Sequence, residues 1–279
     1  MYFGWTTGER CGREDLATRS AVTGGAGCYR RPMRQLLPDL LEDPDVDALY
    51  AADDRPVPVD RPWVMSNMIS SVDGAAALGG VSGGLGGPGD KVVFSALRSV
   101  ADVVVAAAGT VRAERYGPPR TTPAQQARRV ARGQRPFPRI AVVSGSLDLD
   151  YTSALFGPDA PERPIVITGT RPSPEQLGRA SEVAEVIVAG ADRVDLGAAL
   201  RSLHERGAGV VLCEGGPSLN GQLVADDLID ESCVTLSPLL AGGDAARIMH
   251  GGPADAVRPM RLARVLVEGD MLLLRYVRA

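Results

Sequence analysis

Aromatic side chains are scarce in this chain, making up 4% of its 279 residues. Proteins that bind single-stranded nucleic acid stack the bases on aromatic rings, so this scarcity argues against that class. The formal net charge of −4 provides no basic field that would attract nucleic acid or an anionic membrane. We therefore expect neither as a partner, and we expect a core built from Val, Leu, Ile and Ala.

Metal-binding and thiol motifs are also missing. The chain has two histidines and four cysteines, none of them in a CxxC pair: His204, His250, Cys11, Cys28, Cys213 and Cys233. Without ligand spacing for zinc we expect no metal, and a Ser-His-Asp triad would have to use one of the two histidines. Unpaired cysteines suit a reducing compartment, which predicts a cytoplasmic protein. No apolar run is long enough to cross a membrane or to act as a secretory signal.

The chain divides into three parts. Residues 1–33 contain turn formers and scattered charges without periodicity, which predicts a disordered extension. Residues 34–60 show a weak helical pattern of leucines from Leu36 to Leu41 and then several aspartates, which we interpret as a leader segment packed on the domain surface. Residues 61–279 carry the alternating pattern that predicts a single folded domain.

Strands and helices alternate through most of the folded part. Short β-branched runs predict buried strands at residues 63–69, 102–107, 140–143, 165–167, 186–188, 209–213 and 230–236. Helical patterns lie at residues 91–99, 111–116 and 196–206, after Pro174 and from Pro217. This order predicts an α/β fold with a mostly parallel central sheet flanked by helices. Residues 264–268 and 271–277 predict an antiparallel C-terminal hairpin.

Two stretches interrupt the alternation. Residues 120–135 form a basic, Gln-rich connection whose arginines, among them Arg128 and Arg129, suit a solvated face. Glycine recurs through residues 79–89, which predicts a mobile loop. Residues 84–89 match G-x-G-x-x-G but do not directly follow a strand, and Asp90 stands where a P-loop has lysine. Asp90 suits the N-cap of the next helix instead.

The most informative stretch is Glu214-Gly215-Gly216-Pro217-Ser218-Leu219, which follows the strand at 209–213. A strand, a glycine turn and a helix that begins with proline place free N–H groups and a helix dipole at one point, which suits an anion. A tight turn without a ligand has the same pattern. Glu214 favours a site, because open α/β sheets bind ligands at the carboxyl ends of their strands.

Other strands end in small or acidic residues too: Asp73, Gly109, Thr110, Ser144, Thr168 and Gly190. On a parallel sheet these ends share one edge, and a row of polar groups there suits a dinucleotide. Ser144, Thr168 and Arg171 suit an additional phosphate. Asp73 and Glu214 are then the candidates for substrate orientation and proton delivery, although ordinary turn chemistry and helix capping also explain such residues.

Four motifs, in this order, resemble a known family: Arg61-Pro-Trp-Val-Met-Ser-Asn-Met-Ile-Ser-Ser-Val-Asp-Gly74, Leu97-Arg-Ser-Val-Ala-Asp-Val-Val-Val105, Gly109-Thr-Val-Arg-Ala-Glu114 and Glu214-Gly-Gly-Pro-Ser-Leu219. Together they are similar to the riboflavin-pathway pyrimidine reductases, over about residues 61–277. The resemblance implies a dihydrofolate-reductase-like fold, NADPH as cofactor and a homodimer. It also implies reduction of a 5-amino-6-(5-phosphoribosylamino)pyrimidine by hydride transfer to C1′ of its ribose.

The resemblance also assigns roles to individual residues. It implies that Gly109, Thr110 and Glu114 contact NADPH, with Gly215, Gly216, Pro217, Ser218 and Leu219 around its nicotinamide and phosphates. Ser144, Thr168, Arg171 and Gly190 complete the expected cofactor site. The expected substrate site is Asn67, Ser71, Asp73 and Glu214, with Asp73 and Glu214 as the catalytic pair.

Two features leave alternatives open. Asn67 stands where the bifunctional bacterial enzymes tend to have lysine, and the loop after Asp73 is unusually rich in glycine. A dihydrofolate-reducing activity is one alternative. A non-catalytic sensor that binds NADP(H) is another, from a different class. The chain lacks the zinc deaminase pattern, so another protein must perform the deamination step.

Overall fold

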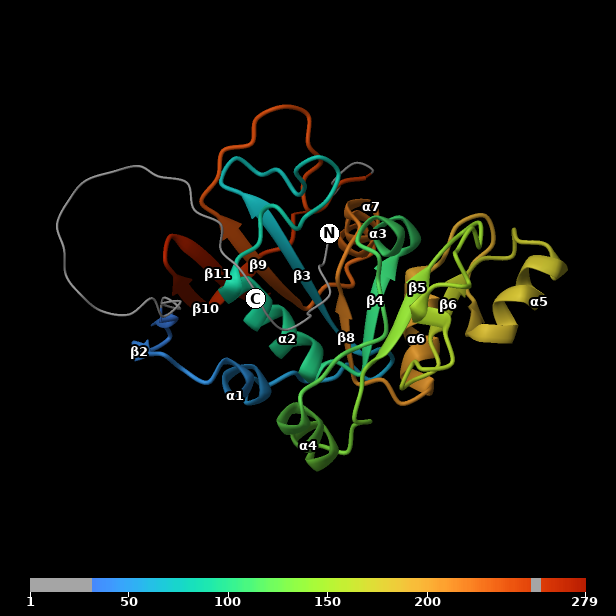
Figure 1. The fold of residues 1–279 in the computed structure, drawn as a ribbon, viewed down its shortest axis with the longest axis horizontal. Coiled ribbons are helices and arrows are strands. Elements are labelled where there is room, and N and C mark those ends of the chain that lie inside the picture. The colour runs from blue at the N-terminus through green and yellow to red at the C-terminus, as the bar shows by residue number, and fades with distance from the viewer. Residues whose placement is uncertain (1–31, 252–256) are drawn as a thin grey trace, which may run out of the picture.

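The computed structural model describes residues 32–251 and 257–279, which form one eleven-stranded sheet with helices on both faces (Figure 1). The predicted disorder of residues 1–33 therefore falls, except for the last two residues, outside the described part. The strands are β1 Arg34–Leu37, β2 Leu41–Glu42, β3 Trp63–Ser71, β4 Val103–Ala107, β5 Arg139–Val143, β6 Ile165–Thr168, β7 Glu185–Val188, β8 Val210–Cys213, β9 Glu231–Ser237, β10 Met260–Glu268 and β11 Met271–Arg278. The helices are α1 Val46–Ala51, α2 Pro88–Val100, α3 Ala108–Ala113, α4 Pro123–Ala131, α5 Pro174–Val183, α6 Leu196–Glu205 and α7 Pro217–Ala225, with a 3-10 turn at Ala154–Phe156.

The strand order is β2-β1-β10-β11-β9-β3-β8-β4-β5-β6-β7. From β9 to β7 every neighbouring pair is parallel, and the pairs formed by β11, β10, β1 and β2 are antiparallel. The predicted α/β fold and the C-terminal hairpin are both confirmed. Because the parallel strands run the same way, all their carboxyl ends meet at one edge of the sheet.

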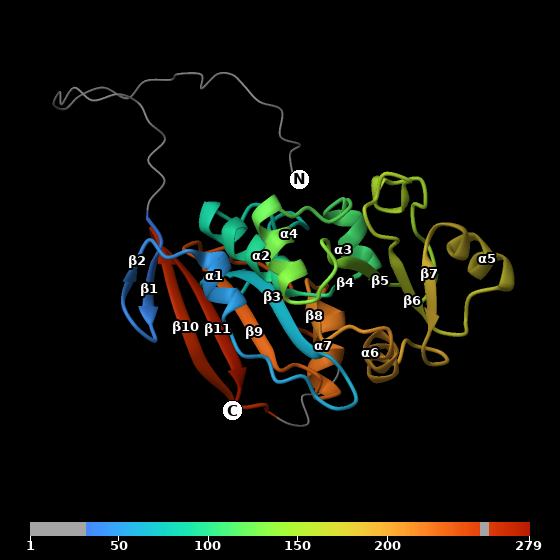
Figure 2. The same ribbon diagram turned by 90° about the horizontal axis from the view of Figure 1, so that it is seen from below.

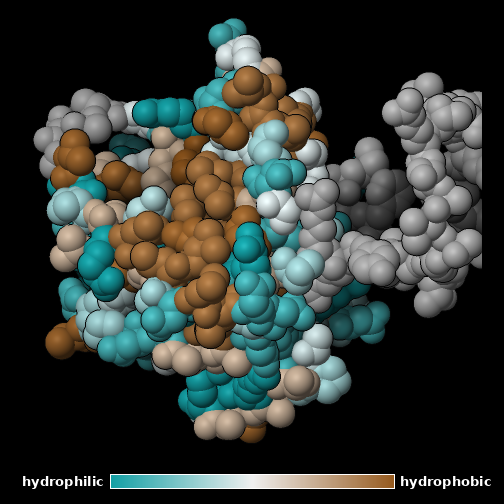
Figure 3. Space-filling model, turned by 90° about the vertical axis from the view of Figure 1, so that its left-hand side faces the viewer, coloured by the Kyte–Doolittle hydropathy of each residue, from teal (hydrophilic) through white to brown (hydrophobic). Residues whose placement is uncertain are grey.

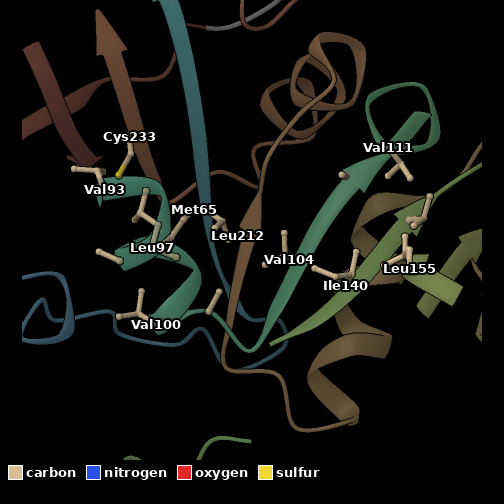
Figure 4. Close-up of a cluster of buried hydrophobic side chains, with 14 of the residues drawn as sticks. Met65, Val93, Leu97, Val100, Val104, Val111, Ile140, Leu155, Leu212 and Cys233 are labelled. Atoms are coloured by element: carbon tan, nitrogen blue, oxygen red, sulfur yellow. The ribbon is translucent and has the colours of Figure 1, made fainter. Parts of the chain in front are cut away.

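Apolar side chains fill the space between the sheet and the helices on both faces. Val93, Leu97 and Val100 of α2 point toward the sheet, where they meet Met65 and Leu212 (Figure 4). A second cluster lies under α6 and α7 on the other face. Figure 2 shows α2 and α4 on one side of the sheet and α6 and α7 on the other. Because helices cover both faces of the sheet, the side chains on both sides of most parallel strands are buried. This explains why the sequences of these strands are continuous apolar runs.

The segment before residue 61 belongs to the sheet. The helical pattern predicted around Leu36 and Leu41 is wrong, because these residues lie in strands β1 and β2, with β1 paired to β10. Leu36 and Leu41 are exposed, whereas Gln35, the neighbour of Leu36 on β1, is buried. The leucines therefore do not form the buried face of a helix. Helix α1 begins later, where the Asp45 carboxylate accepts a hydrogen bond from the Ala48 N–H at 3.0 Å.

A buried ion network attaches this segment to the sheet. Arg264 on β10 contacts Asp53 at 2.7 Å, and Arg55 contacts Glu231 on β9 at 3.1 Å. Arg275 on β11 contacts Glu231 at 2.8 Å as well. Buried charges are tolerated only when they are paired and hydrogen-bonded, so each member depends on the others.

Residues 120–135 contain a helix that the sequence reading missed. Thr122 and Gln125 form a capping box at the start of α4. Arg129, predicted to be solvated, is fully buried and donates hydrogen bonds to the carbonyls of Ser99 and Ala101 at 3.0 and 2.6 Å. Those carbonyls lie at the C-terminal end of α2, where helical partners run out. The prediction of a solvated face is therefore wrong for Arg129.

Two helices begin earlier than predicted. Gly87 is the N-cap of α2, so Asp90 lies in its first turn rather than at the cap. Helix α3 starts at Ala108, which places Gly109 and Thr110 inside its first turn. Both shifts move polar residues from a loop onto a helix at the carboxyl edge of the sheet.

One sheet face at the antiparallel end carries half-buried and exposed apolar side chains. They alternate with the buried positions of β9, β10 and β11 and comprise Val234, Leu236, Val265, Val267, Leu272 and Leu274. Neighbouring strands place them in rows, such as Val267 beside Leu272 and Leu272 beside Leu236. We call this set the open face. Figure 3, drawn from the side of β10 and β11, shows an apolar patch on this end of the molecule.

Candidate active site

The polar residues predicted to share one edge do so. Glu214 follows β8, which lies between β3, followed by Asp73, and β4, followed by Gly109 and Thr110. Ser144, Thr168 and Gly190 follow or end β5, β6 and β7, which lie progressively farther from β8. At a strand spacing of about 4.8 Å, Thr168 is roughly 14 Å from Glu214 along the edge. The edge therefore has a compact centre around Glu214 and an extended arm.

The Gly215–Gly216 turn fits tightly between its neighbours. Its peptide bond is cis, and the Gly215 carbonyl accepts a hydrogen bond from the Ala107 N–H at 2.8 Å. Gly215 has a φ of +96°, and a Cβ added to it would lie 3.2 Å from the Met68 sulfur. A Cβ on Gly216 would lie 3.0 Å from the Thr110 hydroxyl. Helix α7 begins directly after the turn at Pro217, so its first-turn N–H groups, which have no partner within the helix, lie next to the turn.

Glu214 is buried and bound at both oxygens. Arg98 of α2 donates from Nε to Oε1 at 2.6 Å and from Nη2 to Oε2 at 2.7 Å. The Tyr116 hydroxyl donates to Oε2 at 2.6 Å. The guanidinium of Arg98 also lies over the rings of Phe94 and Tyr116. These three hydrogen bonds, two of them from a guanidinium, fix the position of the Glu214 side chain.

Asp73 is an exposed clamp between two loops. Its carboxylate accepts a hydrogen bond from the Ser71 hydroxyl, from the Ala241 N–H at 3.0 Å and from the Gly242 N–H at 2.7 Å. These bonds, with that from Ser71 the largest effect, lower the pKa of Asp73 to about 2. Asp73 therefore carries no proton to deliver near neutral pH, and the geometry supports a holding role instead.

The loop that Asp73 holds, residues 238–251, crosses the edge from β3 to α7. We call it the strap. The Ala76 N–H donates to the Ala246 carbonyl at 2.9 Å, and the Asn220 side chain donates to the Ile248 carbonyl at 3.1 Å. The His250 N–H donates to the Pro217 carbonyl at 3.1 Å. The strap thus connects the loop after Asp73 with the first turn of α7.

The glycine-rich loop is docked on the site through Glu114. The Ser82 N–H and hydroxyl both donate to Glu114 Oε1, each at 2.9 Å. Leu85 is buried. The second carboxylate oxygen of Glu114 is buried and has no hydrogen-bond partner among the described residues. Glu114, expected to contact NADPH, thus holds the loop with one oxygen and keeps the other unpaired.

The other residues predicted for the substrate and cofactor sites differ in their burial and in their hydrogen bonds. Asn67 is half-buried on β3, opposite Cys233, which belongs to the core under α2. Ser71 is buried and bonded to Asp73 and to the Ala75 N–H. The Ser144 hydroxyl accepts from the Leu147 N–H at 3.0 Å.

In the extended arm, around Thr168, Arg171 and Gly190, the backbone turns determine the local geometry. Thr168 is fully buried, and its hydroxyl has no partner among the described residues. Arg171 is exposed, and its guanidinium is 3.5 Å from the Asp192 carbonyl. Gly190 has a φ of +90°, and a Cβ there would lie 2.4 Å from the Arg193 carbonyl, so its own turn requires glycine.

Arg98 and Tyr116 are the residues that sequence reasoning missed. Arg98 stands in one of the four motifs, yet no spacing links it to Glu214, which is 116 residues away in the chain. Only the packing of α2 across the sheet brings the two together.

Neither a metal cluster nor a membrane span occurs in residues 32–251 and 257–279. Within these ranges no group of three or more His, Cys, Asp or Glu side chains is placed to hold a metal ion. Nor is any helix in them long and apolar enough to cross a membrane.

Known proteins match this chain in both sequence and fold. The model of the RibD C-terminal domain matches residues 62–274. The 2,5-diamino-6-ribosylamino-4(3H)-pyrimidinone 5′-phosphate reductase of Methanothermobacter thermautotrophicus is 33% identical over 224 residues, covering 77% of this chain and 98% of the relative. The counterpart from Archaeoglobus fulgidus is 29% identical over 196 residues, covering 68% and 87%.

A solved structure of a pyrimidine reductase-like protein from Corynebacterium diphtheriae superimposes with a TM-score of 0.75 at 28% identity. It covers 84% of this chain and 98% of that protein. The family indicated by the four sequence motifs is confirmed. The chain belongs to the RibD C-terminal domain family, the pyrimidine reductases of riboflavin biosynthesis.

Proposed function

We propose that this protein reduces a 5′-phosphorylated ribosylaminopyrimidine with NADPH, converting the ribose to an open ribityl chain. The observation that carries the proposal is the fixed Glu214 carboxylate beside the Gly215–Gly216 turn and the start of α7. The relatives support it, because their names describe them as reductases of 2,5-diamino-6-ribosylamino-4(3H)-pyrimidinone 5′-phosphate. A charged, preorganised centre at the carboxyl edge suits the binding of a polar substrate next to a dinucleotide.

The residues around the turn fit a nicotinamide dinucleotide. A Cβ on Gly109 would meet no atom within 4 Å, so the first turn of α3 faces open space. The backbone there and at the start of α7 is accessible to phosphate or ribose groups, and the α7 dipole favours negative charge. Ser144, Thr168, Arg171 and Gly190, along the extended arm, are our candidates for the far end of the cofactor. When bound, NADPH supplies the hydride.

The reaction breaks the C1′–O4′ bond of the ribose, adds a hydride to C1′ and adds a proton to O4′. Asp73, with a pKa of about 2, holds the strap rather than giving this proton. Both carboxylate oxygens of Glu214 accept hydrogen bonds from Arg98 or Tyr116. Its role is therefore to hold the Arg98–Glu214 ion pair in place beside the substrate. The proton then comes from solvent or from the substrate itself, and the protein provides positioning and electrostatics.

A homodimer completes the proposal. The open face exposes adjacent apolar rows that a soluble monomer would leave in water. A two-fold axis through the face would pair it with itself, as in most dimers. Met68 on β3 pairs with Val234 of the open face, and its sulfur would lie 3.2 Å from a Cβ added to Gly215. A dimer formed through this face would therefore pack behind the Gly215–Gly216 turn. Leu274→Asp should give a monomer by light scattering, whereas Val188→Asp, exposed on the far edge, should leave the dimer intact; a monomeric wild type would contradict this.

The direct test follows NADPH absorbance with 2,5-diamino-6-ribosylamino-4(3H)-pyrimidinone 5′-phosphate as substrate. We expect oxidation that depends on both compounds. Asp73→Asn should reduce turnover while NADPH binding persists, and Glu175→Gln, in the first turn of α5, should behave as the wild type. NADPH binding without turnover on this pyrimidine would contradict the proposal and favour a sensor.

A further inference from the structure

One ridge of helix α2 leads away from Glu214. Asp90, Phe94 and Arg98 are spaced four residues apart, so their side chains lie along one side of the helix. The Arg98 guanidinium lies 4.2 Å from the centre of the Phe94 ring, and it donates hydrogen bonds to Glu214. The neighbouring ridge of Val93, Leu97 and Val100 is buried against the sheet (Figure 4). The Asp90 ridge is therefore half-buried and continuous with the candidate active site.

Asp90 stands at the far end of this ridge, at the carboxyl edge of the sheet. It lies in the first turn of α2 and approaches Thr235 of β9, which pairs with Ile69 of β3. Asn67 precedes Ile69 by two residues and so shares its side of β3. Asp90, Asn67 and Glu214 thus surround one region of the edge, on the side of the sheet that α2 covers.

The Asp90 carboxylate lacks a cationic partner there. No arginine or lysine forms an ion pair with it among the described residues, although Lys91 follows it in the chain. Glu268 on β10 accepts a hydrogen bond from the N–H of Gly89, the residue before Asp90, at 2.6 Å. Burial raises the pKa of Asp90, and the Thr235 hydroxyl opposes this. A half-buried carboxylate that has a hydroxyl donor but no cation beside it can accept further hydrogen bonds, and a ligand with N–H donors would offset the cost of its burial.

We propose that Asp90 recognises the 2-amino-4-pyrimidinone edge of the substrate by accepting hydrogen bonds from its 2-amino group and its N3–H. The proposal rests on the proposed function, because it places the pyrimidine of that reaction. The two donors are adjacent and parallel, which matches the two oxygens of a carboxylate. Phe94, one helical turn along, provides an apolar ring beside the base, and Glu214 lies beyond it toward the reacting end.

This arrangement selects the amino form of the pyrimidine. In the deaminated pyrimidinedione, an oxygen replaces the 2-amino group, and N3–H lies between two carbonyls. One carboxylate oxygen of Asp90 would then face the carbonyl oxygen at position 2. Both oxygens would be desolvated without a donor, and they would repel each other. The protein should therefore act before deamination, while the 2-amino group is still in place.

The test compares the binding of two ligands, so it does not depend on turnover. Calorimetry on NADP⁺-loaded protein measures the affinity for 2,5-diamino-6-ribosylamino-4(3H)-pyrimidinone 5′-phosphate and for its 2-deaminated dione. We expect the wild type to favour the diamino ligand by about 100-fold. Asp90→Asn should remove or reverse this preference, because an amide accepts from N3–H and donates to the 2-oxygen. Affinity for NADP⁺ should stay unchanged.

Glu175→Gln is the control, since it also removes a carboxylate from the first turn of a helix. Asp90→Ser is the second variant, and thermal unfolding confirms that both Asp90 variants fold. Equal affinity of the wild type for the two ligands, or a preference that survives in both variants, would overturn the role of Asp90. Failure of the wild type to turn over either ligand while it still prefers the diamino form would contradict the proposed function and leave the inference standing.

Discussion

Arg98 holds Glu214 through two parallel hydrogen bonds, from Nε to Oε1 at 2.6 Å and from Nη2 to Oε2 at 2.7 Å. The pair joins α2 to the end of β8, and Tyr116 adds a third bond from the segment after α3. Three elements that are distant in sequence therefore meet at one carboxylate. Because the Gly215–Gly216 turn follows Glu214 directly, this ion pair also fixes where the turn begins.

Glu214→Gln should affect both stability and activity. Glutamine keeps one acceptor oxygen but leaves the half-buried Arg98 without its counter-charge, so we expect a loss of about 3 kcal/mol in the free energy of unfolding. The displaced turn should lower kcat/KM by about 100-fold. Urea unfolding and steady-state kinetics measure the two effects, with the exposed Glu205→Gln as control. A variant with wild-type kinetics would contradict a role for Glu214 in the site.

Gly109→Ala separates cofactor binding from folding. In the free protein the new methyl group meets no atom within 4 Å, and alanine is favoured over glycine in a helix by about 1 kcal/mol. Stability should therefore be equal or higher. If the dinucleotide approaches α3, the methyl group should raise the KM for NADPH more than 10-fold, a cost of about 1.4 kcal/mol.

Gly178→Ala, a helical glycine on α5 with equally open surroundings, is the matched control. It should leave the KM for NADPH unchanged. The same KM in Gly109→Ala would show that the cofactor does not reach α3.

The Asp73 clamp should depend on pH in a defined direction. The pKa of Asp73 is about 2 in the folded protein and near 3.8 without its partners, so the clamp stabilises the fold above pH 4. This contribution is lost as the pH falls through about 2. Asp73→Ala lacks it at every pH, and the strap should then be cleaved faster in limited proteolysis at pH 7. Asp244→Asn, on the exposed strap itself, should be cleaved at the wild-type rate, and equal rates in all three proteins would argue against the clamp.

Arg129 should be far more important for stability than its neighbour. Arg129→Met leaves several buried carbonyls at the end of α2 without donors, at about 3 kcal/mol in total. Burial lowers the pKa of Arg129 to about 10, so it stays charged at neutral pH. Arg128→Met, at a partly exposed position, should cost less than 1 kcal/mol. Thermal unfolding of the two variants compares them directly, and equal losses would contradict the capping role.

The sequence predicted those parts of the fold whose signal is local. Each parallel strand reads as an apolar run followed by a turn residue, and Pro174 and Pro217 mark helix starts that the structure confirms. Strands β1 and β2 were missed because their signal is not local. Their leucines suggest a helix. Only the pairing of β1 with β10, more than 200 residues later, and of β2 with β1 makes them strands. Helix α4 was missed because burying Arg129 depends on carbonyls from α2.

The site was predictable in its position but not in its contacts. The common edge of the strand ends follows from the parallel order, so Asp73, Thr110 and Glu214 were correctly placed together. Which groups hold them could not be seen, because Arg98, Tyr116 and the strap reach the edge through tertiary packing. Asp73 and Glu214 therefore seemed equally suited to proton delivery, whereas the structure shows Asp73 with a lowered pKa and Glu214 held by Arg98 and Tyr116.

Isotope transfer tests the central claim of ribose reduction most directly. The protein is incubated with NADPH that carries deuterium on the transferable position of nicotinamide C4 and with 2,5-diamino-6-ribosylamino-4(3H)-pyrimidinone 5′-phosphate, and the product is analysed by mass spectrometry and NMR. We predict a ribityl product with one deuterium, located at C1′. A product with deuterium on the pyrimidine ring, or oxidation of NADPH without deuterium in the product, would contradict the account.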